Sequence, residues 1–194
     1  MVSTVTWNPA EFDHWFNTVN DPAKRRRALD GLTAPQRKLR RERRTFIQFS
    51  SAAKLDVDPL GVQNRDVPEP DIYCEVSGSS RYFELGELTD ESIPQNEAQA
   101  LRAGHDIHGG YISQSRPLEK MIFAKCAKTY RSGMVPVDLL LHFSVGHQVP
   151  CPQFLSAWMS ESRPRVTAAL QSSPFNTIWV FDCWTDRVLE VIER

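Results

Sequence analysis

The sequence has no apolar run of about 18 residues, the length that a membrane-spanning helix requires. Its first residues, MVSTVTWNPAEF, lack the basic and then apolar layout of a secretory signal peptide. Cysteine is scarce and forms no CxxC spacing, so the thiols are expected to be small buried groups rather than zinc ligands or disulfides. Together these absences predict a cytoplasmic protein. The cysteines are Cys74, Cys126, Cys151 and Cys183.

Two nucleotide-binding signatures are also absent. The chain contains neither the Gly-x-x-x-x-Gly-Lys loop nor the Gly-x-Gly-x-x-Gly fingerprint, so neither a P-loop nor a Rossmann site is predicted. His105 and His108 flank Asp106, but without further ligands nearby this pattern favours a polar loop over a metal site. Cys183 has no histidine at a readable spacing, so a cysteine nucleophile is not expected.

The composition is that of a soluble globular protein, with 41% apolar and 24% charged residues in a chain of 194. That length suits one well-filled domain. Helical periodicity marks the start of the chain, and strand-length apolar runs alternate with helices after it. This order predicts an α/β fold with a mixed central β-sheet flanked by helices. We expect an N-terminal helical extension over residues 1–32 and one compact α/β domain over residues 33–194.

Local signals predict the elements of this domain. Thr33 is a candidate helix N-cap, and Pro164 should kink or break a later helix. The four residues Ser77, Gly78, Ser79 and Ser80 are expected to turn the chain between two strands. The expected helices are 34–54, 94–103, 118–130 and 152–171. The expected strands are 71–76, 81–88, 137–143, 177–181 and 187–192, with one more short strand within 55–70.

The net charge of −1 hides a strongly basic segment. Residues 24–44 carry ten basic and two acidic side chains, so the segment has a charge of +8 and the rest of the chain −9. Such a surface could bind nucleic acid phosphates without sequence preference, although a solvated helix face is the alternative. Arg37 through Arg44 are expected on the exposed part of the helix after Thr33. The predicted nucleic-acid-binding residues are Arg37, Lys38, Arg40, Arg41 and Arg44.

The most informative stretch runs from Pro70 to Leu88 and reads PDIYCEVSGSSRYFELGEL. Asp71 opens the first strand of an expected hairpin, and Glu84 lies in the middle of the second. Two carboxylates on neighbouring strands can converge on one hard divalent cation, which prefers oxygen ligands. The pattern therefore indicates a site for Mg²⁺ or Mn²⁺.

This stretch resembles the signature of the PD-(D/E)XK nuclease superfamily, which is Pro-Asp, a gap, and then an acid-x-Lys triplet. Asp71 and Glu84 match the acids, whereas Gly86 stands in the position of the lysine. The resemblance implies a restriction-endonuclease-like fold and hydrolysis of DNA with Mg²⁺ or Mn²⁺. It also implies that the lysine could come from the following helix, because some families of this kind have moved it there.

Lys125 is the candidate for the displaced lysine. Helical spacing places it with Leu118 and Ile122 on the side of its helix that should face the sheet, whereas Lys120 and Lys128 should point outward. A lysine on that side needs a carboxylate partner. Lys125 would then orient or deprotonate the attacking water. The candidate catalytic residues are Asp71, Glu84 and Lys125, and the candidate metal ligands are Asp71, Glu84 and the Leu85 carbonyl.

Two further acids are candidate ligands. Glu42 lies alone among arginines on the helix after Thr33, where superfamily members often carry an acid. Glu87 is out of phase with Glu84 in a regular strand, so a bulge or the end of the strand would have to turn it toward the site. Two other functions stay open, namely a catalytically inactive nucleic-acid-binding module of the same fold and a protein-interaction domain. Cutting both strands of a duplex would favour a homodimer.

Overall fold

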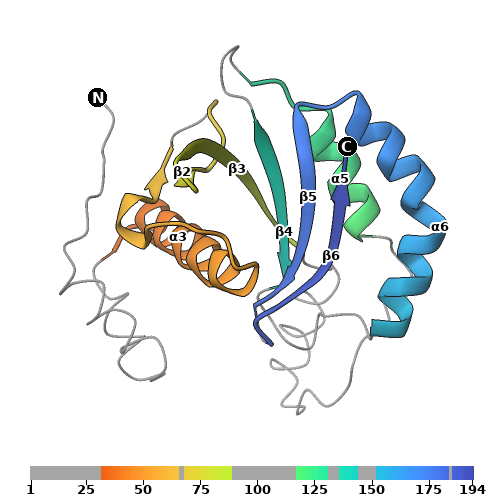
Figure 1. Cartoon of the computed structure of the whole chain (residues 1–194), viewed down its shortest axis with the longest axis horizontal. Helices are drawn as coiled ribbons and strands as arrows, with labels where there is room; N and C mark the ends of the chain where they lie inside the picture. The colour runs from red at the N-terminus through yellow and green to blue at the C-terminus, as the bar shows by residue number, and fades with distance from the viewer. Residues whose placement is uncertain (1–31, 66–67, 89–116, 131–135, 144–151, 184) are drawn as a thin grey trace, which may run out of the picture.

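The computed structural model describes residues 32–65, 68–88, 117–130, 136–143, 152–183 and 185–194. Within them the chain forms one open six-stranded sheet with α-helices on both faces (Figure 1). An α/β fold with a mixed central sheet is thereby confirmed. The expected extension over residues 1–32 falls almost entirely outside the described residues, and the expected helix 94–103 and the His105–His108 pair lie outside them as well.

The sheet is built in chain order, from β1 to β6. The inner strands β3, β4 and β5 run parallel, and the outer pairs β1–β2, β2–β3 and β5–β6 are antiparallel. The strands are β1 (Gln63–Asn64), β2 (Ile72–Val76), β3 (Ser79–Glu87), β4 (Val137–Phe143), β5 (Phe175–Asp182) and β6 (Arg187–Glu193). The helices are α3 (Ala34–Ala52), α5 (Pro117–Cys126) and α6 (Pro152–Gln171), with the short 3-10 helix η1 (Pro59–Gly61).

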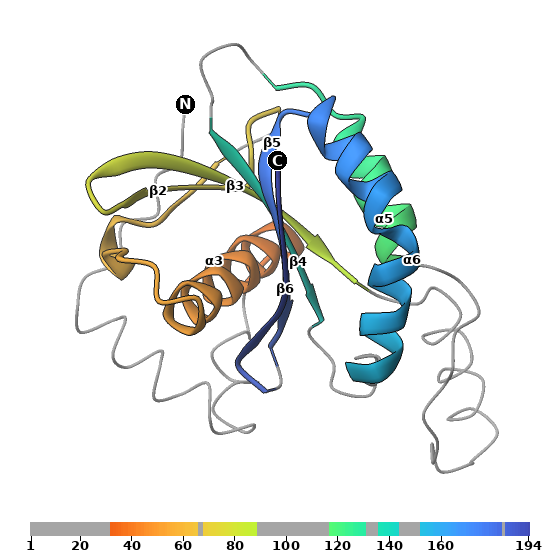
Figure 2. The same cartoon turned by 45° about the vertical axis from the view of Figure 1, so that its right-hand side comes forward.

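The helices divide between the two faces of the sheet. Parallel neighbours need crossover connections, and α5 and α6 lie in the crossovers from β3 to β4 and from β4 to β5. Both cover one face, while α3 covers the other (Figures 1 and 2). In the described residues, none of the helices has the length and apolar character needed to cross a membrane.

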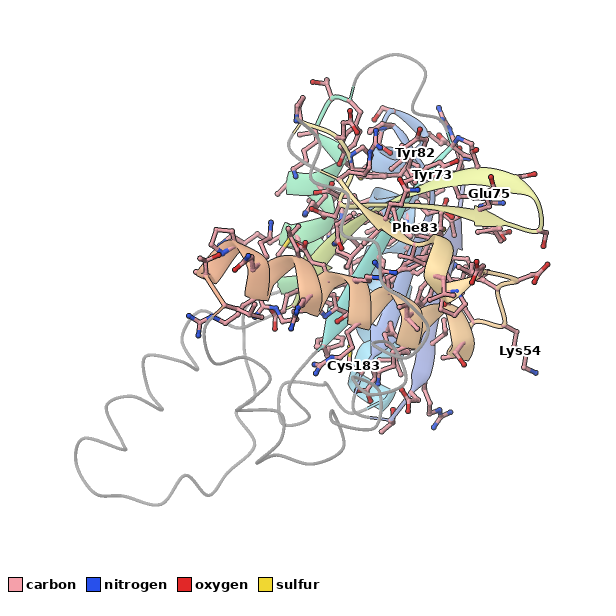
Figure 3. All side chains as sticks on the ribbon, turned by 90° about the vertical axis from the view of Figure 1, so that its left-hand side faces the viewer. Lys54, Tyr73, Glu75, Tyr82, Phe83 and Cys183 are labelled. Atoms are coloured by element: carbon pink, nitrogen blue, oxygen red, sulfur yellow. The ribbon has the colours of Figure 1, made fainter. Side chains whose placement is uncertain are left out.

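Each face has its own core. On the α3 side the core is aromatic: Phe83 lies between the hairpin and α3 (Figure 3), with its ring centroid 4.7 Å from that of Phe46. On the side of α5 and α6 the core is mainly aliphatic and includes Leu118, Ile122 and Leu141. All seven residues of β4 are buried, as expected for a central strand covered on both faces.

The hairpin turn is tighter than its sequence predicts. Only Ser77 and Gly78 form the turn, at φ values of 49° and 76°, and Ser79 already pairs with Val76. The expected four-residue turn is therefore wrong. A two-residue hairpin loop with positive φ at both positions matches the twist of the strands, so β3 begins two residues earlier than expected.

Two helices also differ from expectation. Helix α5 ends at Cys126 rather than near residue 130, and the chain leaves it so that Tyr130 packs against Phe175, with ring centroids 6.0 Å apart. Helix α6 runs through Pro164 without a break. Pro164 and Ser160 are both exposed, so water can solvate the Ser160 carbonyl that the missing N–H leaves free.

Helix α3 starts as predicted. The Thr33 hydroxyl accepts from the backbone N–H of Gln36, and the Gln36 side chain accepts from the Thr33 N–H, which completes a capping box. The helix ends at Ala52, slightly before the expected end. Arg43 differs from the prediction that this arginine run is exposed. It is buried and donates to the Pro59 carbonyl at 3.1 Å, because this side of α3 packs against the segment that holds η1.

Candidate functional site

A pocket of about 460 Å³ opens beside the carboxyl-terminal half of β3. Its walls come from α3, from the segment before β2, from β3, and from α5 with the residues that follow it. These segments are far apart in sequence and come together only in the folded structure. The charged residues of the lining are Lys38, Arg41, Glu42, Glu69, Asp71, Glu84, Glu87, Lys125 and Lys128.

Asp71 enters the pocket from the position just before β2. Ile72 pairs with Phe83, so the antiparallel register carries Asp71 opposite Glu84. Its Oδ2 accepts a hydrogen bond of 2.8 Å from the Leu85 N–H. Burial raises the pKa of Asp71, and the negative charge of Glu84 raises it further, against the opposing effect of the Leu85 N–H. A positive charge close to Asp71 would therefore stabilise its ionised form.

Glu84 is buried, with 2% of its surface exposed, and is held by two lysines. Lys125 Nζ and Lys128 Nζ each lie 2.6 Å from Glu84 Oε1. Burial pushes the pKa of Glu84 upward, but the charges and hydrogen bonds of Lys125 and Lys128 outweigh it and hold the pKa below 4.5. Glu84 is therefore ionised at neutral pH.

Lys125 occupies the space above Gly86. Its Nζ donates to the Leu85 carbonyl at 2.6 Å as well as to Glu84, so one ammonium bridges two oxygens of β3. A Cβ on Gly86 would lie 3.5 Å from Lys125 Cε and only 2.7 Å from Leu141 Cδ2. A side chain at Gly86 would thus collide with the buried core. The glycine that departs from the acid-x-Lys pattern leaves room for the lysine of α5.

The two additional acids both line the pocket, on the α3 side. Glu42 pairs with Lys38, at 3.2 Å between Nζ and Oε1. Burial raises the pKa of Glu42, and the charge of Asp71 adds to that effect, which indicates that the two carboxylates share one electrostatic environment. Glu87 lies 3.6 Å from Arg41, measured from Oε2 to Nη2. Helix α3 therefore brings one acid and two cations to the pocket.

Lys128 is a pocket residue that the sequence pattern missed. Its helical position predicted an outward side chain, but α5 ends at Cys126 and the following turn directs Lys128 back to Glu84. The expectation of an outward orientation is therefore wrong. The pattern of helical spacing applies only while the helix continues, and no signal in the sequence marks its end here.

The predicted nucleic-acid-binding residues lie along α3 with different exposures. Arg37 and Lys38 are exposed, Arg41 is 53% exposed in its side chain, and Arg40 and Arg44 are half-buried. Lys38 and Arg41 reach the pocket itself through their acidic partners. The basic face is thus continuous with one wall of the pocket.

A histidine of β4 that lines the pocket meets a cysteine that follows β5, which the sequence spacing did not suggest. His142 Nδ1 lies 3.9 Å from Cys183 Sγ. Burial lowers the pKa of His142 to about 4 and raises the pKa of Cys183 to about 12. Both groups are neutral at pH 7, so the pair has no thiolate for nucleophilic attack.

The donor set of the pocket fits a hard divalent cation. Asp71 and Glu84 supply carboxylate oxygens and Leu85 a carbonyl oxygen, whereas the residues described in the structure contain no group of three or more Asp, Glu, His or Cys side chains arranged to hold a metal. Mg²⁺ keeps several water ligands and is often held by one or two carboxylates. A fully protein-coordinated ion such as structural zinc does not suit this set.

The pocket can therefore combine buried carboxylates, a lysine between two oxygens and a basic wall in one place. Comparisons with protein-family models, with curated proteins and with solved structures found no match for this chain.

Proposed function

We propose that the protein is a metal-dependent, nuclease-like enzyme that hydrolyses phosphodiester bonds in DNA, on a restriction-endonuclease-like version of its α/β fold. One observation carries this proposal. Lys125 Nζ lies 2.6 Å from both Glu84 Oε1 and the Leu85 carbonyl oxygen, in the pocket that also contains Asp71. In an acid-x-Lys strand, the acid and the lysine two residues after it come together in the same way. In this protein the strand supplies the acid, and α5 supplies the lysine.

The residues of the pocket have distinct parts in this reaction. Asp71, Glu84 and the Leu85 carbonyl would hold Mg²⁺ or Mn²⁺, which when bound polarises a phosphate oxygen and lowers the pKa of a water. Lys125 would orient the attacking water through Nζ and offset the negative charge that develops on the phosphate. Glu42 lies near enough to Asp71 for that carboxylate to raise its pKa, and it could accept a hydrogen bond from a metal-bound water.

The substrate would be guided by α3. Lys38 and Arg41 border the pocket, and Arg37 and Arg40 continue the basic face along the helix. A DNA backbone lying on this face would have its phosphates drawn toward the carboxylates of the pocket. A homodimer would supply the two sites that a double-strand cut requires.

The proposal is tested by calorimetric titration of Mn²⁺ and by cleavage of end-labelled duplex DNA. We expect saturable Mn²⁺ binding by the wild type. Asp71→Asn and Glu84→Gln should each weaken that binding at least about 10-fold. Cleavage should fall at least about 100-fold, because the charge that stabilises the transition state is lost.

Glu75→Gln is the matched control, since Glu75 is an exposed carboxylate on the same hairpin, away from the pocket lining (Figure 3). It should keep both Mn²⁺ binding and cleavage. A wild type that binds no Mn²⁺, with or without DNA, would contradict the proposal.

A nucleic-acid-binding module without catalysis is the second candidate, favoured by the state of Glu84. Two lysines already neutralise this carboxylate. In that case DNA binding would be independent of Mn²⁺ and would depend on the α3 face alone. Arg37→Glu with Arg40→Glu would then abolish DNA binding, while Asp71→Asn would leave it unchanged. This result in the absence of cleavage would replace the first proposal.

A further inference from the structure

Glu84 has more positive charge around it than one carboxylate needs. Both Lys125 Nζ and Lys128 Nζ lie 2.6 Å from the same oxygen, Oε1. One ammonium suffices to neutralise one carboxylate, and two ammonium groups on one oxygen must lie close to each other and repel. The second lysine is therefore in excess for neutralising Glu84.

The two lysines are not equivalent. Lys125 is 16% exposed in its side chain, has the Leu85 carbonyl as a second acceptor and passes above Gly86. Lys128 is 48% exposed and lies beyond the end of α5 at Cys126. Lys128 can therefore exchange Glu84 for another anion more readily than Lys125, whose ammonium is more buried and has a second acceptor in the Leu85 carbonyl.

The charge balance of the pocket indicates how the release of Lys128 from Glu84 would affect the binding of a phosphate. Its lining contains the four cations Lys38, Arg41, Lys125 and Lys128 and five carboxylates, of which Glu69 is paired with Arg65, so the pocket has no excess of positive charge. The two remaining titratable groups, His142 and Tyr130, are neutral at pH 7, because burial lowers the pKa of His142 to about 4 and raises the pKa of Tyr130. While Lys128 is held by Glu84, the pocket therefore offers a phosphate no surplus positive charge, and a divalent cation would supply it.

We propose that Lys128 is a substrate-binding residue that leaves Glu84 for a phosphate oxygen of the substrate when a divalent cation occupies the Glu84 carboxylate. The inference rests on the proposed function and names how phosphate binding and cation binding are coupled. Without a cation, Lys128 serves as a counter-charge of Glu84. With one, Lys128 is repelled from Glu84 and becomes available to the substrate, while the more buried Lys125 stays beside β3.

The coupling makes two opposite predictions for one variant, Lys128→Met. Ca²⁺ affinity should rise by about 2- to 5-fold, because a competing cation has been removed from Glu84. Affinity for a short fluorescent DNA duplex in the presence of Ca²⁺ should fall by about 10-fold, because a charged hydrogen bond to phosphate has been lost. Without Ca²⁺ the DNA affinity should change little.

Calorimetry with Ca²⁺ and fluorescence anisotropy with the duplex measure both effects without cleavage. Lys120→Met is the matched control, since Lys120 is an exposed lysine of α5 that does not line the pocket. It should change neither affinity. Lys128→Arg should restore DNA binding in Ca²⁺, because the positive charge is retained. Circular dichroism and thermal unfolding verify that each variant is folded.

The outcomes separate this inference from the proposed function. If Ca²⁺ and DNA bind but Lys128→Met behaves like Lys120→Met, the role of Lys128 is overturned and the proposed function stands. If the wild type binds neither Ca²⁺ nor Mn²⁺, with DNA present or absent, both are overturned. If Lys128→Met weakens DNA binding equally with and without Ca²⁺, Lys128 is an ordinary phosphate contact and the coupling is overturned.

Discussion

Glu84 on β3 and Asp138 on β4 are buried acids on neighbouring strands. They differ in their ion-pair partners, in the face of the sheet to which they point and in the direction of their pKa shifts. Asp138 is 1% exposed and pairs with Arg81, at 3.0 Å between Oδ2 and Nη1. Glu84 is 2% exposed and pairs with Lys125 and Lys128. Because Phe83 pairs with Asp138 across the two strands, the acids point to opposite faces of the sheet.

The pKa values of the two acids shift in opposite directions. For Asp138 the effect of burial exceeds that of Arg81, and the pKa rises above 3.8. For Glu84 the two lysines exceed the effect of burial, and the pKa falls below 4.5. One partly exposed arginine compensates a buried carboxylate less fully than two lysines at 2.6 Å.

The difference shows how a buried charge can serve either structure or chemistry. Glu84 borders the pocket of about 460 Å³, so the cations around it can exchange with a ligand. Asp138 borders neither this pocket nor the second one between α6 and β6 in the described part of the chain. Its ion pair ties β3 to β4, and we interpret it as structural.

The largest expected effect comes from removing the ion pair between Arg81 and Asp138. Arg81→Met should lower the free energy of unfolding by about 3 kcal/mol, because it leaves the Asp138 carboxylate buried without its cation. Urea unfolding followed by circular dichroism measures this change. Arg187→Met, at an exposed arginine of β6, should cost less than about 0.5 kcal/mol. Equal small losses in both variants would show that Asp138 does not depend on Arg81.

A smaller effect is expected at Gly86, beneath Lys125. Gly86→Ala adds a methyl group 2.7 Å from Leu141 Cδ2, and it should lower the free energy of unfolding by about 1–3 kcal/mol through overpacking. The methyl group would lie 3.5 Å from Lys125 Cε, an ordinary van der Waals contact, so Mn²⁺ affinity should change little in the same variant. Gly61→Ala is the control, because its nearest contact would be an ordinary 3.7 Å to Asp58 Oδ2. A Gly86→Ala protein with unchanged stability would contradict the close contact seen here.

The smallest expected effect is on the pH dependence of the free energy of unfolding, to which Glu84 and Asp138 should contribute with opposite signs. A carboxylate with a lowered pKa is less protonated in the folded than in the unfolded state, so its stabilising contribution rises with pH and is lost as pH falls through the folded pKa. Glu84 should show this below pH 4.5. Asp138 has a raised pKa, so its contribution should instead fall as pH rises above 3.8.

The measurement is the difference in unfolding free energy between the wild type and each neutral variant, Glu84→Gln and Asp138→Asn, over the acid range. The difference should increase with pH for Glu84→Gln and decrease for Asp138→Asn. Slopes of the same sign would mean that the two carboxylates do not differ in the way the structure indicates.

Several features of the fold could be predicted because they depend on short segments. The Thr33 cap, the fully buried β4 and the strand pair that carries Asp71 and Glu84 follow from turn chemistry, alternation and apolar runs. The inward position of Lys125 followed from helical spacing, because it lies before the end of α5. Two errors occurred at boundaries, in the turn after β2 and at the end of α5, and two within helices, at Pro164 and at the buried Arg43.

What the sequence determined by itself is the local framework: the backbone period and the turn residues already bring two carboxylates to adjacent strands and one lysine to the inner side of a helix. Only the tertiary structure decided which other charges join them. Lys128 reaches Glu84 because α5 stops at Cys126, Glu42 approaches Asp71 because α3 packs beside β3, and Arg43 is buried against the segment of η1. These contacts depend on how separate elements pack, and a local pattern in the chain contains no information about that packing.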